Sequence, residues 1–123
     1  GSYIEGNRNF HMGSDAGSYS VGDNNMAIGE QAGLFTTGSR NSVIGLQAGS
    51  QVQGNDNLVF GAEAGQNIHG DDNIALGRET GKGVTGQRNT SLGMGAGVAA
   101  LGNDNIGIGS NANMGAPTFL QYS

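Results

Sequence analysis

The sequence predicts an all-β solenoid that completes one turn every 16 residues. Three observations lead to this fold class. The chain matches itself at a shift of 16 residues, so that seven units begin at regularly spaced glycines (Gly6, Gly22, Gly38, Gly54, Gly70, Gly86 and Gly102). Between the glycines the segments are short, and apolar residues alternate around the fifth and seventh positions of the unit, which is strand spacing. The unit is also too short for a helical repeat, which needs roughly 33 residues or more.

We call the residues at one position of the unit a column and number the columns from the first glycine. Glycine fills columns 1 and 8 in every unit and column 12 in all units but the last, where Asn113 replaces it. Glycine and asparagine at constant offsets supply the positive-φ conformations of tight corners. Each unit is therefore expected to contain two short strands and two corners. Seven turns stacked at the spacing of neighbouring strands would form a rod of roughly 35 Å.

Column 4 is asparagine in every unit. Stacked asparagines can hydrogen-bond from turn to turn, and we expect a structural ladder rather than a binding site. The predicted ladder consists of Asn9, Asn25, Asn41, Asn57, Asn73, Asn89 and Asn105.

The apolar columns predict a core and a contact surface. Column 7 is always large and apolar, and we expect it to form the core: Met12, Ile28, Ile44, Phe60, Leu76, Leu92 and Ile108. Column 11 is small, as expected if it meets column 7 across a thin coil. Column 6 should point the other way, and its small residues Ala27, Val43, Val59 and Ala75 are predicted to form a seam with another chain. One large residue and one alanine per turn make a weak core, which favours association.

The units "NMAIGEQAG", "NSVIGLQAG" and "NIALGRETG" resemble the head repeats of trimeric autotransporter adhesins of the YadA type. They are also similar to "NTAIG"-type repeats of phage tail fibres and other trimeric bacterial fibres. The resemblance extends over about residues 3–115. It implies a left-handed parallel β-roll, three copies side by side, and an extracellular role in attachment from a bacterial surface or a virion.

The ends of the chain differ from the repeat. Gly1 and Ser2 have the composition of a cloning scar, and the repeat domain is expected to span residues 3–117. Pro117 stands in column 16 and cannot donate a hydrogen bond to a sheet, so we expect the solenoid to stop there. Residues 118–123 should cap the last turn or lead into a further domain.

Catalytic and cofactor chemistry finds little support in the sequence. There is no cysteine, no Ser-His-Asp arrangement stands apart from the repeat, and His11 and His69 occupy different columns, so no enzyme activity, metal or cofactor is expected. "GKGVTG" matches a dinucleotide fingerprint only through repeat glycines. Acidic corners such as "GDDN" suggest calcium, but arginine or glutamine interrupts the same column.

Charge and hydropathy narrow the range of partners. A net charge of −5 with five scattered Lys and Arg argues against nucleic acid. No apolar run reaches the roughly 18 residues needed to span a bilayer, so this segment is not expected to insert into a membrane. Column 3 places opposite charges one turn apart, which predicts the pairs Arg40–Asp56, Asp72–Arg88 and Arg88–Asp104.

The predicted function is attachment by a non-enzymatic trimeric fibre, with the chain itself and a cell-surface glycan or protein receptor as partners. Tyr19 and Phe35 are neighbouring aromatics in column 14, which is otherwise polar or small, and they are candidate contacts for a ligand. The first alternative is a structural spacer that positions a separate binding tip. The second is a solenoid that binds calcium or ice.

Overall fold

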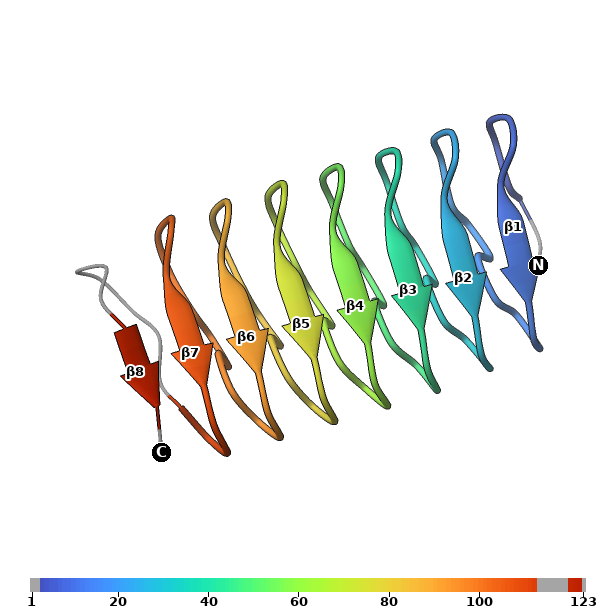
Figure 1. Cartoon of the computed structure of the whole chain (residues 1–123). Coiled ribbons are helices and arrows are strands. Elements are labelled where there is room, and N and C mark those ends of the chain that lie inside the picture. Colours follow the sequence, from blue (N-terminus) through green and yellow to red (C-terminus); the bar gives the residue numbers. More distant parts are fainter. Residues whose placement is uncertain (1–2, 113–119, 123) are drawn as a thin grey trace.

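The computed structural model describes residues 3–112 and 120–122, and these form one parallel sheet of eight strands in chain order, with no helix (Figure 1). The strands are β1 (Phe10–Met12), β2 (Met26–Ile28), β3 (Ser42–Ile44), β4 (Leu58–Phe60), β5 (Ile74–Leu76), β6 (Thr90–Leu92), β7 (Ile106–Ile108) and β8 (Leu120–Tyr122). Strands β1 to β7 each consist of columns 5 to 7 of one unit. The predicted parallel β-solenoid is therefore confirmed, with about six turns in the described part of the chain.

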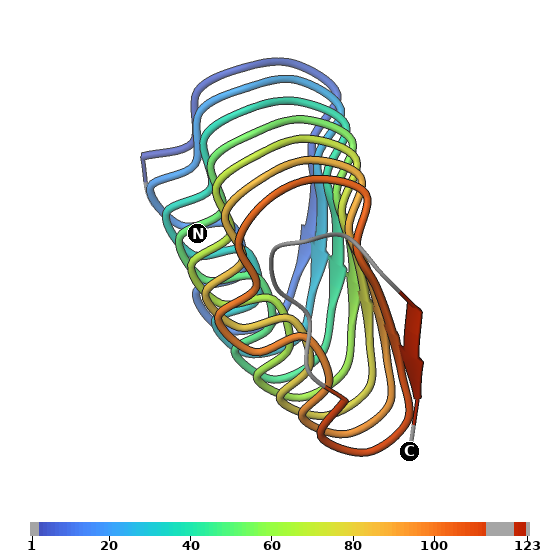
Figure 2. The ribbon, with the colours of Figure 1, turned by 90° about the vertical axis from the view of Figure 1, so that its left-hand side faces the viewer.

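The register between strands follows the repeat. From β1 to β7 each residue pairs with the one 16 positions later, so Phe10 lies opposite Met26 and Met26 opposite Ser42. The second strand expected in each turn is reduced to a single bridging residue in column 16, such as Val21 opposite Thr37. Viewed nearly end-on, the turns superimpose as one flattened loop, with the strands along one side (Figure 2).

The C-terminal segment extends the sheet. Strand β8 pairs in parallel with β7, with Leu120 opposite Ile106. Residues 118–123 were expected to cap the solenoid or to lead into a further domain, and their described part, residues 120–122, adds one strand to the sheet. The prediction that the solenoid stops at Pro117 was therefore wrong, because the parallel sheet continues after it. Gly1, Ser2, Asn113 and Pro117 lie outside the described residues.

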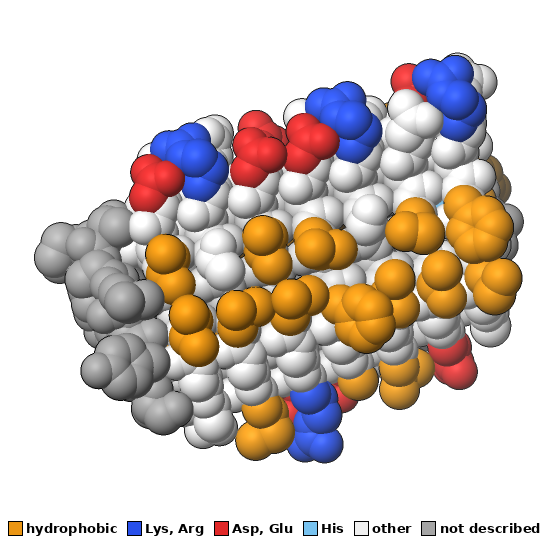
Figure 3. Space-filling model, in the orientation of Figure 1, with side chains coloured by type: hydrophobic (Ala, Val, Ile, Leu, Met, Phe, Trp, Pro, Cys, Tyr) orange, Lys and Arg blue, Asp and Glu red, His pale blue; other side chains and the backbone are white. Residues whose placement is uncertain are grey.

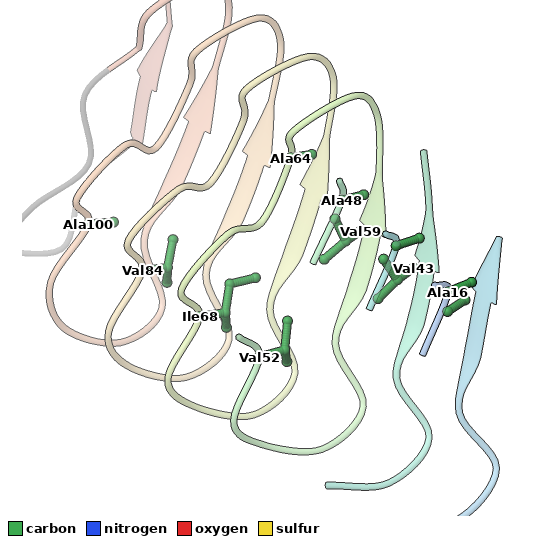
Figure 4. Packing of buried hydrophobic residues seen from close by; sticks show 11 residues of the cluster. Ala16, Val43, Ala48, Val52, Val59, Ala64, Ile68, Val84 and Ala100 are labelled. Atoms are coloured by element: carbon green, nitrogen blue, oxygen red, sulfur yellow. The ribbon is translucent and has the colours of Figure 1, made fainter. Parts of the chain in front are cut away.

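The core lies between the strand side and the opposite side of each turn. Its side chains come from columns 6, 11 and 15, and Val59, Ala64 and Ile68 represent these columns in one unit with no solvent exposure (Figure 4). The largest fully buried side chain among the described residues is Ile68. The interior is therefore thin, and its apolar side chains are alanine, valine and a single isoleucine, with serine or threonine at a few of the same positions.

The predictions of which column faces the interior, column 7, and which faces outward, column 6, were wrong. Column 6, predicted as the seam, is buried in the chain's own core, where Ala27, Val43, Val59 and Ala75 are at most 3% exposed. Column 7, predicted as the core, points outward. Its members Met12, Phe60 and Ile108 are exposed, and Ile28, Ile44, Leu76 and Leu92 are half-buried.

The glycines of column 12 explain why column 6 faces inward. A Cβ built on Gly65 would lie 2.6 Å from Cγ2 of Val59, and one built on Gly49 would lie 2.7 Å from Cγ1 of Val43. Column 12, on the opposite side of the coil, therefore has no side chain, and the side chains of column 6 occupy that space. A large column 7 residue would not fit this space, so the alternation of the strand places it outside.

The asparagines of column 4 form a buried ladder that joins each turn to the next. The side-chain oxygen of Asn41 accepts a hydrogen bond from the backbone N–H of Asn57 at 3.0 Å. The Nδ2 of Asn57 donates to the carbonyl oxygen of Gly70 at 2.9 Å. The same pattern recurs along the stack for Asn9, Asn25, Asn41, Asn57, Asn73 and Asn89. At the end of the ladder, Asn105 Nδ2 donates to the carbonyl oxygen of Leu101, and Asn105 Oδ1 has no partner among the described residues. The ladder mainly holds backbone groups, and bonds between side chains are secondary.

Candidate functional site

The most extensive candidate site is an apolar face on the outside of the sheet, which we call the sheet face. It consists of columns 5 and 7, and its two rows of hydrophobic side chains run the length of the solenoid (Figure 3). In columns 5 and 7 of strands β1 to β7 only Ser42 and Thr90 are polar, and neither column contains a charged residue. Phe60 is 53% exposed and Met12 is 56% exposed. A continuous apolar surface of this kind marks an interaction site more often than scattered exposed residues do.

A charged row borders the sheet face at column 3. Arg40 Nε lies 2.8 Å from Asp56 Oδ1, and Arg88 Nε lies 2.6 Å from Asp104 Oδ1. Hydrogen bonding to the guanidinium lowers the pKa of Asp56 and of Asp104 below the usual value. Two of the three predicted pairs are thus confirmed. The Asp72–Arg88 pair is absent from the described residues, because Arg88 turns toward Asp104.

The aromatic candidates Tyr19 and Phe35 are part of a three-ring stack. The ring centroids of Tyr19 and Phe35 are 5.0 Å apart, and those of Tyr3 and Tyr19 are 5.3 Å apart, with nearly parallel planes. Tyr19 and Phe35 remain 47% and 45% exposed, but the contacts with their neighbours cover faces of the rings. Stacking covers both faces of the middle ring, Tyr19, and fits a role in holding adjacent turns together.

His11 occupies the inward-facing column 6 in the first unit and is half-buried. Burial lowers the pKa of its imidazole below 6.5, because the charged form loses hydration. The unfolded chain therefore binds more protons than the folded chain as the pH falls through the ordinary histidine range. Stability should be greatest above about pH 6.5 and should decrease below it, until the pH reaches the lowered pKa of the folded state.

We expect the melting temperature of the chain to fall between pH 7.5 and pH 5.5, as measured by circular dichroism. The variant His11→Ser should lose most of this pH dependence, since Ser91 already occupies the same column. The matched control is His69→Thr, because His69 is exposed in column 16, where Thr37 and Thr85 also stand. A His11→Ser variant with an unchanged pH dependence would contradict this assignment.

The described residues do not form the metal or dinucleotide sites that the sequence motifs could suggest. Within residues 3–112 and 120–122, no three or more His, Asp or Glu side chains are grouped so that they could hold a metal ion. Gly81, Gly83 and Gly86 lie in a turn of the solenoid, and no described helix follows them. Over the same described residues, no helix is long and apolar enough to cross a membrane.

Two structural features were missed by sequence reasoning. Tyr3 stands 16 residues before Tyr19, so the repeat extended backward would have placed it in the aromatic column. Column 15 carries Val52, Ile68 and Val84 in mid-chain, an apolar run that signals the core, but it is polar at Ser20 and Thr36.

Compared with protein-family models, curated proteins and solved structures, the chain gives no match.

Proposed function

We propose that this chain is a segment of a homotrimeric fibre that mediates attachment to a cell surface or host receptor. The observation that carries the proposal is the sheet face, a continuous uncharged apolar surface on the outside of a chain with a thin core. Exposed apolar surface is unfavourable by about 25 cal/mol per Å², so covering the sheet face stabilises the chain. Association then supplies the burial that the interior cannot.

The occupant that fits the sheet face best is another copy of the same chain. A second copy presents large apolar side chains at the same turn-to-turn spacing, so the rows can interdigitate along their whole length. A partner without this period would match only a few turns. The choice of three copies, and of a left-handed coil, rests on the resemblance of the repeats to trimeric adhesin heads.

In such a trimer columns 5 and 7 would face the common axis, and the charged column 3 would remain in contact with water. Large side chains such as Phe60 would then be buried between chains, although they are exposed on one chain. This arrangement explains why the outward column carries larger apolar residues than the inward one. It also moves the predicted seam from column 6 to columns 5 and 7.

Light scattering should give about three times the chain mass of 12.4 kDa. We expect Phe60→Asp to lower this mass to that of one chain, because burying three carboxylates near one axis is strongly unfavourable. The control Gln53→Asp adds the same charge at an exposed position in column 16 and should leave the mass unchanged. A wild-type mass near 12.4 kDa would refute the trimer, whatever the variant does.

Attachment would arise from several weak contacts made at once by a rigid, multivalent rod. The proposed location is extracellular, on a bacterial surface or a virion fibre. The alternative, a spacer that positions a separate binding tip, is favoured by the aromatic stack, because its rings pack on one another. If the trimeric segment is not retained on cells or on an immobilised glycan panel, the spacer is the correct function.

A further inference from the structure

We propose that a notch along the corner of the fifth, sixth and seventh units binds a sugar residue that carries a carboxylate group. The notch has a volume of about 460 Å³ and is open to solvent. It is lined by Arg78, Glu79, Lys82, Met94, Gly95, Val98 and Asn111. These residues come from columns 9, 10 and 13, so the notch lies outside the sheet face.

The notch exists because one residue of column 10 lacks a side chain. In earlier turns this column forms polar contacts between neighbours, as where Gln47 Nε2 donates to Gln31 Oε1 at 3.1 Å. Gly95 interrupts the column between Glu79 and Asn111. A Cβ at Gly95 would lie 2.5 Å from Oδ1 of Asn111, so the amide of Asn111 reaches into the space that a side chain would fill.

The notch also concentrates positive charge in an acidic chain. The arginines of column 3 each have a hydrogen-bond acceptor one turn away, for example Asn24 Oδ1 at 3.0 Å from Arg8 Nε. Lys82 has no ion pair or side-chain hydrogen bond among the described residues. Among the described residues, the Arg78 guanidinium pairs with its half-buried neighbour Glu79, with Nε to Oε2 at 3.4 Å. The formal charge of the notch is therefore positive, with an ammonium group available for a ligand.

The mixture of groups selects the ligand class. Lys82 and Arg78 would bind a carboxylate, whereas the Glu79 carboxylate and the Asn111 amide suit hydroxyl groups. Met94 and Val98 are 50% and 48% exposed and offer an apolar wall to the C–H face of a sugar ring. Glu79 disfavours ligands with several negative charges by repulsion. A singly charged acidic monosaccharide matches all of these groups.

As a contact point for an acidic glycan, the notch deepens the attachment role and rests on that proposed function for its biological meaning. Its binding can nevertheless be measured on the chain in any oligomeric state. One site on one chain should be weak. Three copies on a rod would bind a glycan surface more strongly through multivalency.

The test is a titration of the ¹⁵N-labelled chain with D-glucuronate, D-glucose and acetate, followed by NMR. We expect saturable shifts of the Gly95 and Asn111 amides with glucuronate, and binding about tenfold weaker for glucose and for acetate, since each lacks part of the recognised group. Equal binding of glucose would overturn the carboxylate requirement. Equal binding of acetate would mean an adventitious anion only and would overturn the proposal.

Two variants locate the site. Lys82→Gln should weaken glucuronate binding about tenfold, and Gly95→Gln should abolish it by filling the notch. The Gly95 backbone has φ +69°, and Gln47 adopts φ +54° in the same column, so the backbone accepts glutamine once the Asn111 amide, 2.5 Å from the new Cβ, turns aside. The control Arg40→Gln removes the same charge from column 3 and should not change binding. Unchanged binding by both notch variants would overturn the proposal.

Light scattering on the same samples separates this proposal from the fibre proposal. If the chain is monomeric and binds glucuronate, the notch proposal stands and the trimer proposal is refuted. If the chain is trimeric and shows no NMR shifts with glucuronate, the fibre proposal stands and the notch proposal is refuted.

Discussion

The variant Gly70→Ala is expected to lose roughly 2–6 kcal/mol of folding stability, or to fail to fold at 37 °C. Gly70 stands in column 1 with φ +143°, a conformation that residues with a Cβ rarely adopt. A Cβ there would overlap the carbonyl oxygen of Gly86 in the next turn. The oxygen cannot move away freely, because Asn73 Nδ2 donates a hydrogen bond to it at 2.9 Å. The substitution therefore strains the corner and disrupts the asparagine ladder together.

The matched control is Gly83→Ala, the same chemical change in column 14 of the same unit. The nearest atom to a Cβ at Gly83 is Cα of Ala99 at 3.7 Å, an ordinary contact. Ala99 itself has φ +59° in that column, so alanine is compatible with the backbone there. We expect this variant to lose about 1–2 kcal/mol. Thermal and urea unfolding followed by circular dichroism would measure both, and equal losses would contradict the close approach at column 1.

The variant Asn57→Ala is expected to lose about 2–5 kcal/mol. Asn57 is 1% exposed. Its Nδ2 donates to Gly70 O at 2.9 Å, and its Oδ1 accepts from the backbone N–H of Asn73 at 2.9 Å. Alanine would leave both backbone groups buried without a partner. Each such group is unfavourable by about 1–3 kcal/mol, which gives the range expected in urea unfolding.

Two further variants test this role of Asn57. Asn67→Ala makes the same change at an exposed corner and should lose only about 1 kcal/mol from the left-handed backbone conformation. Asn57→Asp keeps the acceptor but places a buried negative charge where a donor is needed. Its stability should rise as the pH falls, because a protonated carboxyl can donate to Gly70 O again. If Asn57→Ala loses no more stability than Asn67→Ala, the ladder is not a major source of stability.

The repeat unit predicted much of the fold because each turn of a solenoid repeats the same local structure. The 16-residue shift anticipated the pairing of Phe10 with Met26, and the invariant asparagine anticipated the buried ladder. The length of the second strand was overestimated, because only one residue per turn, in column 16, pairs with the neighbouring turn on that side. The notch at Gly95 was not foreseen, because one glycine among many carries no signal until the neighbouring turns stand beside it.

By itself, the sequence determined the period, the parallel stacking of the turns and the columns that must be glycine or asparagine. Only the tertiary structure decided which side of each strand is enclosed. Alternation along a strand places Val59 and Phe60 on opposite sides, but it does not say which side is the interior. That choice depends on the space left by the opposite side of the coil, where Gly65 has no side chain and Val59 occupies the space that a Cβ would fill. The large apolar residues are therefore left outside, on the face through which we propose that copies of the chain associate.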